Sequence, residues 1–254
     1  MNSASGPGRT AEDFLSAVQF LTRVPVPSIP YQPDSLARAI KFFPLVGALL
    51  GAAAALLHRA LVPHLGRLPT ALVIVIFLVW STGCLHEDGL ADTADGLGGG
   101  RNREQILLIF RDSRIGSYGA AALSLSLFAR VILIASVPLS QIAQYLVAAH
   151  ILCRWTTLPL SYFCAPAREK EGQGARVAQL TTRNSLILGT AFSFLSVGLL
   201  LRWRSFAPLL FAIAATLLSA RFYKRKIGGL TGDCLGATNQ LTEIAVYLCG
   251  AWIV

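Results

Sequence analysis

The chain has 254 residues, of which 54% are hydrophobic and only 14% are charged. Soluble domains usually carry about 25% charged residues, so this composition argues against a soluble protein and predicts one that crosses a membrane several times. The net charge of +9 comes from basic residues that are scattered between apolar segments. Because they form no basic stripe with interleaved aromatic residues, we expect no nucleic acid as a partner. The five cysteines form no CxxC pair, which argues against a zinc or redox site.

The N-terminal segment, before the first long apolar run, is expected to stay outside the bilayer. Residues 1–9 are expected to be disordered. Residues 10–22 predict a short amphipathic helix, with Thr10 as its N-cap and an apolar stripe that includes Phe14 and Val18. A helix of this length cannot cross a bilayer, so we expect it to lie at the membrane surface.

Seven apolar segments are candidates for membrane-spanning helices. They cover about residues 42–62, 68–85, 116–137, 141–163, 185–201, 206–220 and 241–254. The last segment is short for the ~20 residues that a bilayer requires, so its helix is expected to begin inside the preceding polar motif. The sequence therefore predicts one all-α domain over residues 1–254. It would be a polytopic integral membrane helical bundle of about seven transmembrane helices, plus the N-terminal interfacial amphipathic helix.

The distribution of charge predicts the orientation in the membrane. If the N-terminus is cytoplasmic and the spans alternate, the outer loops contain few basic residues, namely Arg59, Arg67, Arg202 and Arg204. Most other Lys and Arg residues then fall on the cytoplasmic side, as the positive-inside rule requires. Every Asp and Glu falls there too, which indicates that the acidic residues serve chemistry at this face. We expect a multi-pass protein of the cell membrane whose active site faces the cytoplasm.

The most informative stretch is residues 86–115, a cytoplasmic motif loop that combines acidic and basic residues. Asp88, Asp92 and Asp95 stand at positions i, i+4 and i+7, which places three carboxylates on one face of a helix. Glu87 lies about 100° around the same helix. Like charges at this spacing repel one another, so we expect a cation between them, and hard oxygen ligands favour Mg²⁺. The predicted metal ligands are Glu87, Asp88, Asp92 and Asp95.

His86 and the segment after the acidic helix supply further candidates. His86 is either a general base near neutral pH or an ordinary interfacial histidine. In residues 111–119, backbone amides at a helix start and the guanidinium of Arg114 would suit a phosphate group. The alternative is a plain helix cap, supplied by Asp112 or Ser113. The candidate catalytic residues are His86, Asp92 and Arg114, and the candidate substrate contacts here are Arg111, Asp112, Ser113, Gly116 and Tyr118.

A second polar motif, residues 228–243, precedes the last apolar segment. On a helix, Asp233, Gly236, Gln240 and Glu243 fall on one side. A polar stripe in a helix that enters a membrane usually faces a site, although a polar interfacial turn is the simpler alternative. The predicted substrate contacts in this motif are Thr231, Asp233, Gln240 and Glu243.

Two arginines, Arg130 and Arg154, lie within apolar segments. A buried Arg needs a polar partner or a water-filled cavity, so each should face the interior of the bundle rather than lipid. Arg154 either reaches the substrate or forms a structural pair, and we keep it as a candidate substrate contact.

Five segments together resemble the cobalamin synthase family, the adenosylcobinamide-GDP ribazoletransferases. They read FLTRVPVP, FFPLVGALLG, HEDGLADTADGLGGG, RDSRIGSYG and GGLTGDCLGATNQLTE. They run from Phe20 to Glu243, so the resemblance covers the whole chain, and the acidic motif followed by DSRIGSYG is highly specific. The segment Ala167–Ala175 is similar to a family YAR-x-x-G-x-G segment, but it has no Tyr directly before Ala167-Arg168 and carries extra charged residues.

The resemblance implies a magnesium-dependent transferase of a substituted phosphate group, embedded in the bacterial inner membrane, in the last stage of cobalamin (vitamin B12) biosynthesis. The ribose hydroxyl of α-ribazole, or of its 5′-phosphate, would attack the pyrophosphate of adenosylcobinamide-GDP, and GMP would leave. The choice between the two acceptors stays open, and so does a homo-oligomeric state.

Two alternatives come from other classes of membrane protein. Phosphatidyltransferases that act on CDP-activated alcohols also use Gly-spaced aspartates, but their DG-x-x-AR pattern is absent because Asp88-Gly89 is followed by Leu-Ala-Asp. Cation or metabolite transporters place charged groups near the bilayer midplane, at broken helices. The expected clustering of acids at one face favours an enzyme.

Overall fold

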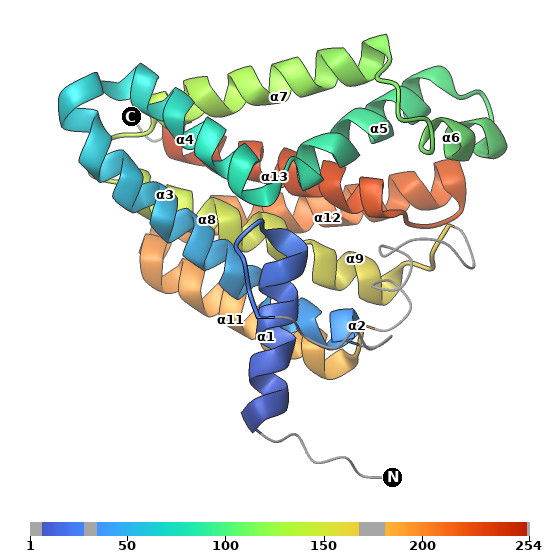
Figure 1. Cartoon of the computed structure of the whole chain (residues 1–254), viewed down its shortest axis with the longest axis horizontal. Coiled ribbons are helices and arrows are strands. Elements are labelled where there is room, and N and C mark those ends of the chain that lie inside the picture. The colour runs from blue at the N-terminus through green and yellow to red at the C-terminus, as the bar shows by residue number, and fades with distance from the viewer. Residues whose placement is uncertain (1–6, 28–34, 168–180, 253–254) are drawn as a thin grey trace.

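The computed structural model describes residues 7–27, 35–167 and 181–252, and its secondary structure there is helical apart from a single parallel bridge between Pro166 and Leu230. The predicted all-α fold is confirmed (Figure 1). The helices are α1 (Pro7–Leu21), α2 (Ser35–Ala39), η1 (Ile40–Phe42), α3 (Phe43–Leu65), α4 (Arg67–Thr82), α5 (Leu85–Gly99), α6 (Arg103–Ile109), α7 (Ser117–Ser136), α8 (Ile142–Trp155), α9 (Thr157–Phe163), α11 (Arg183–Leu201), η2 (Arg202–Ser205), α12 (Phe206–Ile227) and α13 (Gly232–Trp252).

Helix α8 forms the centre of the bundle. Most of its side chains are buried, and α3, α11, α12 and α13 pack around it. Gly47 and Gly51 let α3 approach α8 closely, because a Cβ at these positions would collide with the backbone of His150 and Leu146, respectively. Gly-x-x-x-Gly patterns are frequent by chance in Ala-rich helices, but this one marks a contact between backbones.

The described residues contain three helical stretches that are long and apolar enough to cross a membrane: Ser35–Leu65, Ser117–Ser136 and Arg183–Ile227. A break at η2 divides the third into α11 and α12, which have 19 and 22 residues and are each about as long as one span. A fourth crossing results if α4 and α5, bent by 89°, form one broken span. The chain is therefore a membrane protein, while the number of about seven spans stays a prediction.

The ends of the helices gather at two opposite ends of the bundle. Figure 1 shows the α3–α4 turn, η2 and the C-terminal end of α13 at one end, and α6 and the α12–α13 turn at the other. Alternating spans produce this arrangement. The expected span at 141–163 is instead divided at Thr156 into α8 and α9. The last helix, α13, begins at Gly232, inside the polar motif as expected.

An N-terminal helix is present, and α1 begins at Pro7, so residues 7–9 belong to it rather than to a disordered tail. Its apolar face packs against the protein: Phe14 meets Phe42 edge-on, and Phe20 stacks on Phe43. On its polar side, Asp13 pairs with Arg38 and Lys41 on the following helices. Figure 1 shows α1 running across the direction of α3. Its place at a membrane surface remains a prediction.

A sharp bend between α4 and α5 positions the acidic motif. Gly83 and Cys84 both have left-handed backbone conformations, with φ of 63° and 62°, and together they end one helix and start the next. Such a conformation is free of strain for Gly and uncommon for Cys. The bend turns α5 against α13 and α7, which carry the second polar motif and Arg130.

Candidate active site

The three aspartates of the acidic helix α5 differ in how deeply they are buried. Asp88 is exposed, Asp92 is half-buried and Asp95 is buried. The predicted helix is confirmed, so the three carboxylates share one face. Asp92 feels the negative charges of Asp88, Asp95 and also Asp233 from α13. The structure thus adds a fourth carboxylate to this face, from the second polar motif.

Asp95 holds the start of α7. The backbone N–H of Gly116 donates to one of its carboxylate oxygens at 2.7 Å, and the N–H of Gly119 donates to the other at 2.8 Å. A Cβ at Gly116 or Gly119 would collide with this carboxylate, so both glycines are required for its approach. The cap expected from Asp112 or Ser113 therefore comes from Asp95. The amide of Gly116, expected at a substrate phosphate, is engaged within the protein.

The segment between α6 and α7 keeps its charged groups in solvent. Asp112 accepts from the backbone N–H and the guanidinium of Arg114, with the closest contact at 2.7 Å. These hydrogen bonds lower the pKa of the Asp112 carboxyl to about 2. Arg111 and Ser113 are also exposed, and the ring of Tyr118 lies against Gly98 at the end of α5. Arg111, Ser113 and Arg114 thus remain accessible to a ligand.

A buried charge network joins α5, α7 and α13. Nη1 of Arg130 lies 2.7 Å from Oε1 of Glu87, and its Nε lies 3.0 Å from Oε1 of Glu243. Gln240 accepts from Arg130 and from Ser126, and donates to Glu87. Glu87, expected as a metal ligand, therefore uses one oxygen for Arg130, and its other oxygen is buried without a hydrogen-bond partner in the described structure. Gln240 and Glu243, expected as substrate contacts, belong to the same network.

Arg154 faces the interior, as its position in an apolar segment predicts. It is 2% exposed, and Nη1 contacts Nδ1 of His150 at 2.9 Å and Sγ of Cys153 at 3.2 Å. His150, Cys153 and Glu243 have ligand atoms close enough for a metal ion. The guanidinium of Arg154 already contacts two of these side chains, His150 and Cys153, which favours hydrogen bonds to a buried cation over a metal site.

Two small cavities open on either side of the acidic face. One of about 180 Å³ is lined by His86, Asp88 and Asp233, together with Leu21 of α1 and Thr157 of α9. The other, of about 220 Å³, places Ser113 near Asp88 and Asp92. The structure therefore brings His86, Asp88, Asp92, Ser113 and Asp233 to one region. It places Arg154 with His150 and Cys153 in the core.

The second polar motif meets α5 at two glycines. A Cβ at Gly89 would lie 2.9 Å from the backbone oxygen of Asp233, and a Cβ at Gly236 would lie 3.2 Å from Gly89. Thr231, expected as a substrate contact, accepts from the N–H of Cys234 at 3.3 Å and so caps α13. This cap is the structural alternative to binding for Thr231.

One basic residue whose structural role the sequence did not indicate is Arg103. Its guanidinium donates to the carbonyl of Ile227 at 2.9 Å and to that of Ala167 at 2.8 Å, which ties α6 to the end of α12. Only the tertiary structure reveals these acceptors, because they lie far away in sequence. Arg168 and most of the Ala167–Ala175 segment lie outside the described residues.

A model of the cobalamin-5-phosphate synthase family matches residues 13–251, nearly the whole chain. The chain belongs to this family. Among relatives named adenosylcobinamide-GDP ribazoletransferase, that of Pseudoalteromonas atlantica is 37% identical over 238 residues, covering 92% of this chain and 88% of the relative. That of Sinorhizobium medicae is 40% identical over 252 residues, with 92% and 94% covered. That of Vibrio cholerae is 33% identical over 243 residues, with 93% and 92% covered. No solved structure matches the chain.

Membership of the cobalamin-5-phosphate synthase family raises the question of whether these residues suit Mg²⁺. Asp88 and Asp92 are accessible carboxylates, and Asp95 and Asp233 add negative charge next to Asp92. Mg²⁺ prefers carboxylate oxygens and retains several waters, so one or two accessible carboxylates at an open face suit it well. The donor set fits the ion.

Proposed function

We propose that the protein is an adenosylcobinamide-GDP ribazoletransferase. It would join α-ribazole, or its 5′-phosphate, to adenosylcobinamide-GDP, with release of GMP. The observation that carries the proposal is the cluster of Asp88, Asp92 and Asp233 at one face of α5, with Arg114 in solvent nearby, in a membrane protein of this family. Carboxylates beside an accessible guanidinium are what a magnesium–pyrophosphate group requires.

Mg²⁺ would be held mainly by Asp88 and Asp92, because these two are the accessible members of the expected ligand set. Bound there, the ion would polarise the pyrophosphate and offset the charge that develops as GMP leaves. Asp95 would contribute negative charge without binding the ion directly, because both of its carboxylate oxygens already accept from backbone amides at the start of α7. Glu87 would contribute charge through the Arg130 network rather than as a direct ligand.

The remaining candidates receive roles from their positions. Arg114 and Arg111 would bind phosphate oxygens, because both are exposed on the segment that leads into α7. Ser113 would contact the same group from the cavity that it shares with Asp92. His86 would accept the proton of the attacking ribose hydroxyl, because it lines the neighbouring cavity with Asp88.

The orientation of the site follows from the charge distribution. The exposed basic residues of α6, of the segment after it and of the end of α12 lie at the same end of the bundle as the acidic helix. By the positive-inside rule, that end would face the cytoplasm. The active site would then be open to substrates made in the cytoplasm.

The direct test is product analysis with the purified protein. Detergent-solubilised or vesicle-reconstituted enzyme, incubated with adenosylcobinamide-GDP, Mg²⁺ and α-ribazole or its 5′-phosphate, should form the joined cobamide and one GMP per turnover, measured by mass spectrometry. The same preparation should not transfer a phosphatidyl group from a CDP-activated lipid. Release of GMP without a joined product, or uptake of substrate into sealed vesicles without turnover, would reject the proposal.

A further inference from the structure

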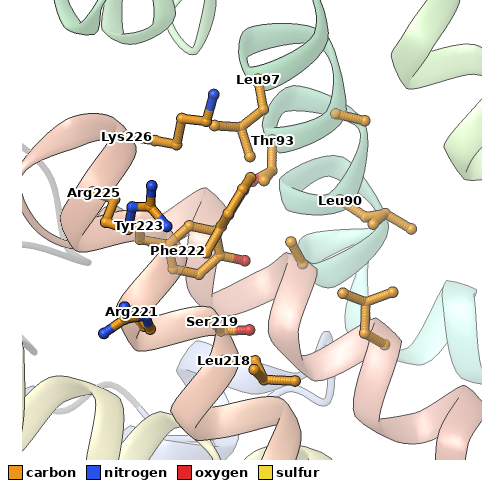
Figure 2. A pocket seen from close by; sticks show the side chains of 13 residues that line it. Leu90, Thr93, Leu97, Leu218, Ser219, Arg221, Phe222, Tyr223, Arg225 and Lys226 are labelled. Carbon is orange, nitrogen blue, oxygen red and sulfur yellow. The ribbon is translucent and has the colours of Figure 1, made fainter.

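A large cavity lies between α5, α12 and α13, apart from the groups assigned to the reaction. Its volume is about 790 Å³, which is in the range of sites that bind small molecules. Figure 2 shows Leu90, Thr93 and Leu97 of α5 on one wall and Leu218 and Phe222 of α12 on the other. Its walls are largely apolar, so its ligand should have an apolar body.

Helix geometry separates this cavity from the carboxylates. At about 100° per residue, Asp92 and Asp95 lie within about 40° of Asp88 around α5. The cavity residues of the same helix are turned by roughly 120° to 180° from Asp88, and they are Leu90, Thr93, Ala94 and Leu97. A ligand in the cavity therefore lies behind the acidic helix and does not share the pyrophosphate site.

The mouth of the cavity is positively charged. Arg221, Arg225 and Lys226, all exposed, belong to the last turns of α12 and line it, and none of the described residues that line it is acidic. The ammonium group of Lys226 lies 6.0 Å from the ring centre of Phe222, between the basic and the apolar parts of the cavity. The ligand should therefore carry a negative charge at the end that meets α12.

The same helix places the cavity at the level of lipid headgroups. The outer face of α12 is apolar before the basic turn, with exposed Leu210, Phe211, Leu217 and Leu218. A membrane helix that changes from apolar to basic in this way leaves the hydrocarbon at the change, where anionic headgroups lie. Leu218 and Leu241 line the cavity and are 67% and 51% exposed, so they offer an apolar path for an acyl chain that a soluble nucleotide would not use.

We propose that this cavity binds one anionic phospholipid. Its phosphate would contact Arg225 and Lys226, and an acyl chain would lie along Leu218, Phe222 and Leu241 against the back of α5. Basic pockets between membrane helices on the cytoplasmic side suit acidic lipids for this reason. The inference does not depend on the proposed transferase activity. Helix α5 would then separate the two sites, with the lipid on one face of the helix and the carboxylates on the opposite face.

Photolabelling tests the site. The delipidated full-length protein would be reconstituted with phosphatidylglycerol that carries a photoreactive acyl chain, and labelled peptides would be identified by mass spectrometry. We expect label on residues 218–226 and on α5, displaced by excess phosphatidylglycerol but not by phosphatidylcholine. Equal displacement by phosphatidylcholine, or protection by GDP instead of lipid, would overturn the proposal.

Paired variants make the test specific. Arg225→Gln with Lys226→Gln removes two cations from the mouth and should weaken phosphatidylglycerol binding roughly thirtyfold, since each cation near an anionic membrane contributes about fivefold. Arg59→Gln with Arg202→Gln removes the same charge elsewhere and should leave the labelling unchanged. Ala94→Phe, which fills the cavity without changing charge, should also abolish the label. Full labelling in either cavity variant, or an equal loss in the control, would show that the lipid contact is nonspecific.

Discussion

At the scale of residues, the role of each acidic side chain depends on the groups that it contacts. The spacing of Asp88, Asp92 and Asp95 correctly predicted a shared helical face. It did not reveal that Asp95 caps α7 or that Glu87 pairs with Arg130, because these partners lie 21 and 43 residues away and meet only when α7 packs on α5. The sequence indicated that Arg130 needed a partner, but not which one.

The buried network should respond strongly to loss of its cation. Arg130→Met would leave Glu87 and Glu243 as buried charges without their partner, which costs about 3–5 kcal/mol. Thermal unfolding in detergent should show a much lower midpoint than that of the wild type. Arg59→Met, at an exposed position, is the matched control. Equal midpoints for the two variants would show that the ion pairs contribute little.

At the scale of elements, α5 is the part that the sequence predicted best. Its helix and its polar face are as expected. The 89° bend before it was not predicted, because nothing in the sequence around Cys84 requires a left-handed residue there. The bend directs α5 against α13, so the two polar motifs, far apart in the chain, lie side by side.

Helix α7 should depend on Asp95. Asp95→Ala removes the acceptor for two backbone amides and should destabilise the protein by about 2 kcal/mol, even without Mg²⁺. Asp112→Ala is the comparison, because it removes an exposed carboxylate whose partner is also exposed, and should change the midpoint little. The measurement is the midpoint of thermal unfolding of both variants without metal. An unchanged melt for Asp95→Ala would contradict the capping role.

The contact between α5 and α13 should require Gly89. In Gly89→Ala, the added Cβ would lie 2.9 Å from the backbone oxygen of Asp233, so the helices must separate. We expect lower stability and reduced turnover. In Gly99→Ala, the nearest atom is the end of Ile109 at 3.5 Å, an ordinary contact, and the helix preference of Ala should keep stability level or raise it. Equal behaviour of the two variants, by melting and by GMP release, would argue against a close contact.

At the scale of the whole molecule, composition and the apolar segments predicted an all-α membrane bundle. They did not separate helices that face lipid from helices that face protein. Helix α8 shows why: it is apolar on nearly every side because it is buried in the centre, and its sequence looks like that of a spanning helix. The break at Thr156 does have a local signal, Pro159, which has no N–H to donate to the carbonyl of Trp155, but the span expected at 141–163 ran through it.

The orientation can be tested on intact cells. In a background without the native cysteines, Ser113→Cys should resist a membrane-impermeant thiol reagent applied from outside, because the motif segment is expected in the cytoplasm. Ser140→Cys, at the exposed turn between α7 and α8, should react. Both should react after the cells are permeabilised. Labelling of position 113 from outside would reverse the proposed topology.

The central claim is that the acidic face of α5 holds magnesium and pyrophosphate for transfer. Its most direct test is Asp92→Asn, which keeps the size of the side chain and removes its charge, with Glu12→Gln on the exposed side of α1 as the control.

The measurement is GMP release by the purified variants as Mg²⁺ is titrated, together with the thermal midpoint at each concentration. We expect Asp92→Asn to lower turnover by roughly a hundredfold or more, because it removes part of the electrostatic stabilisation of the transition state. Its midpoint without magnesium should stay level or rise, since repulsion from Asp88 and Asp233 is relieved, while the stabilisation added by magnesium shrinks. Normal turnover with an unchanged magnesium response would show that this face is not the metal site.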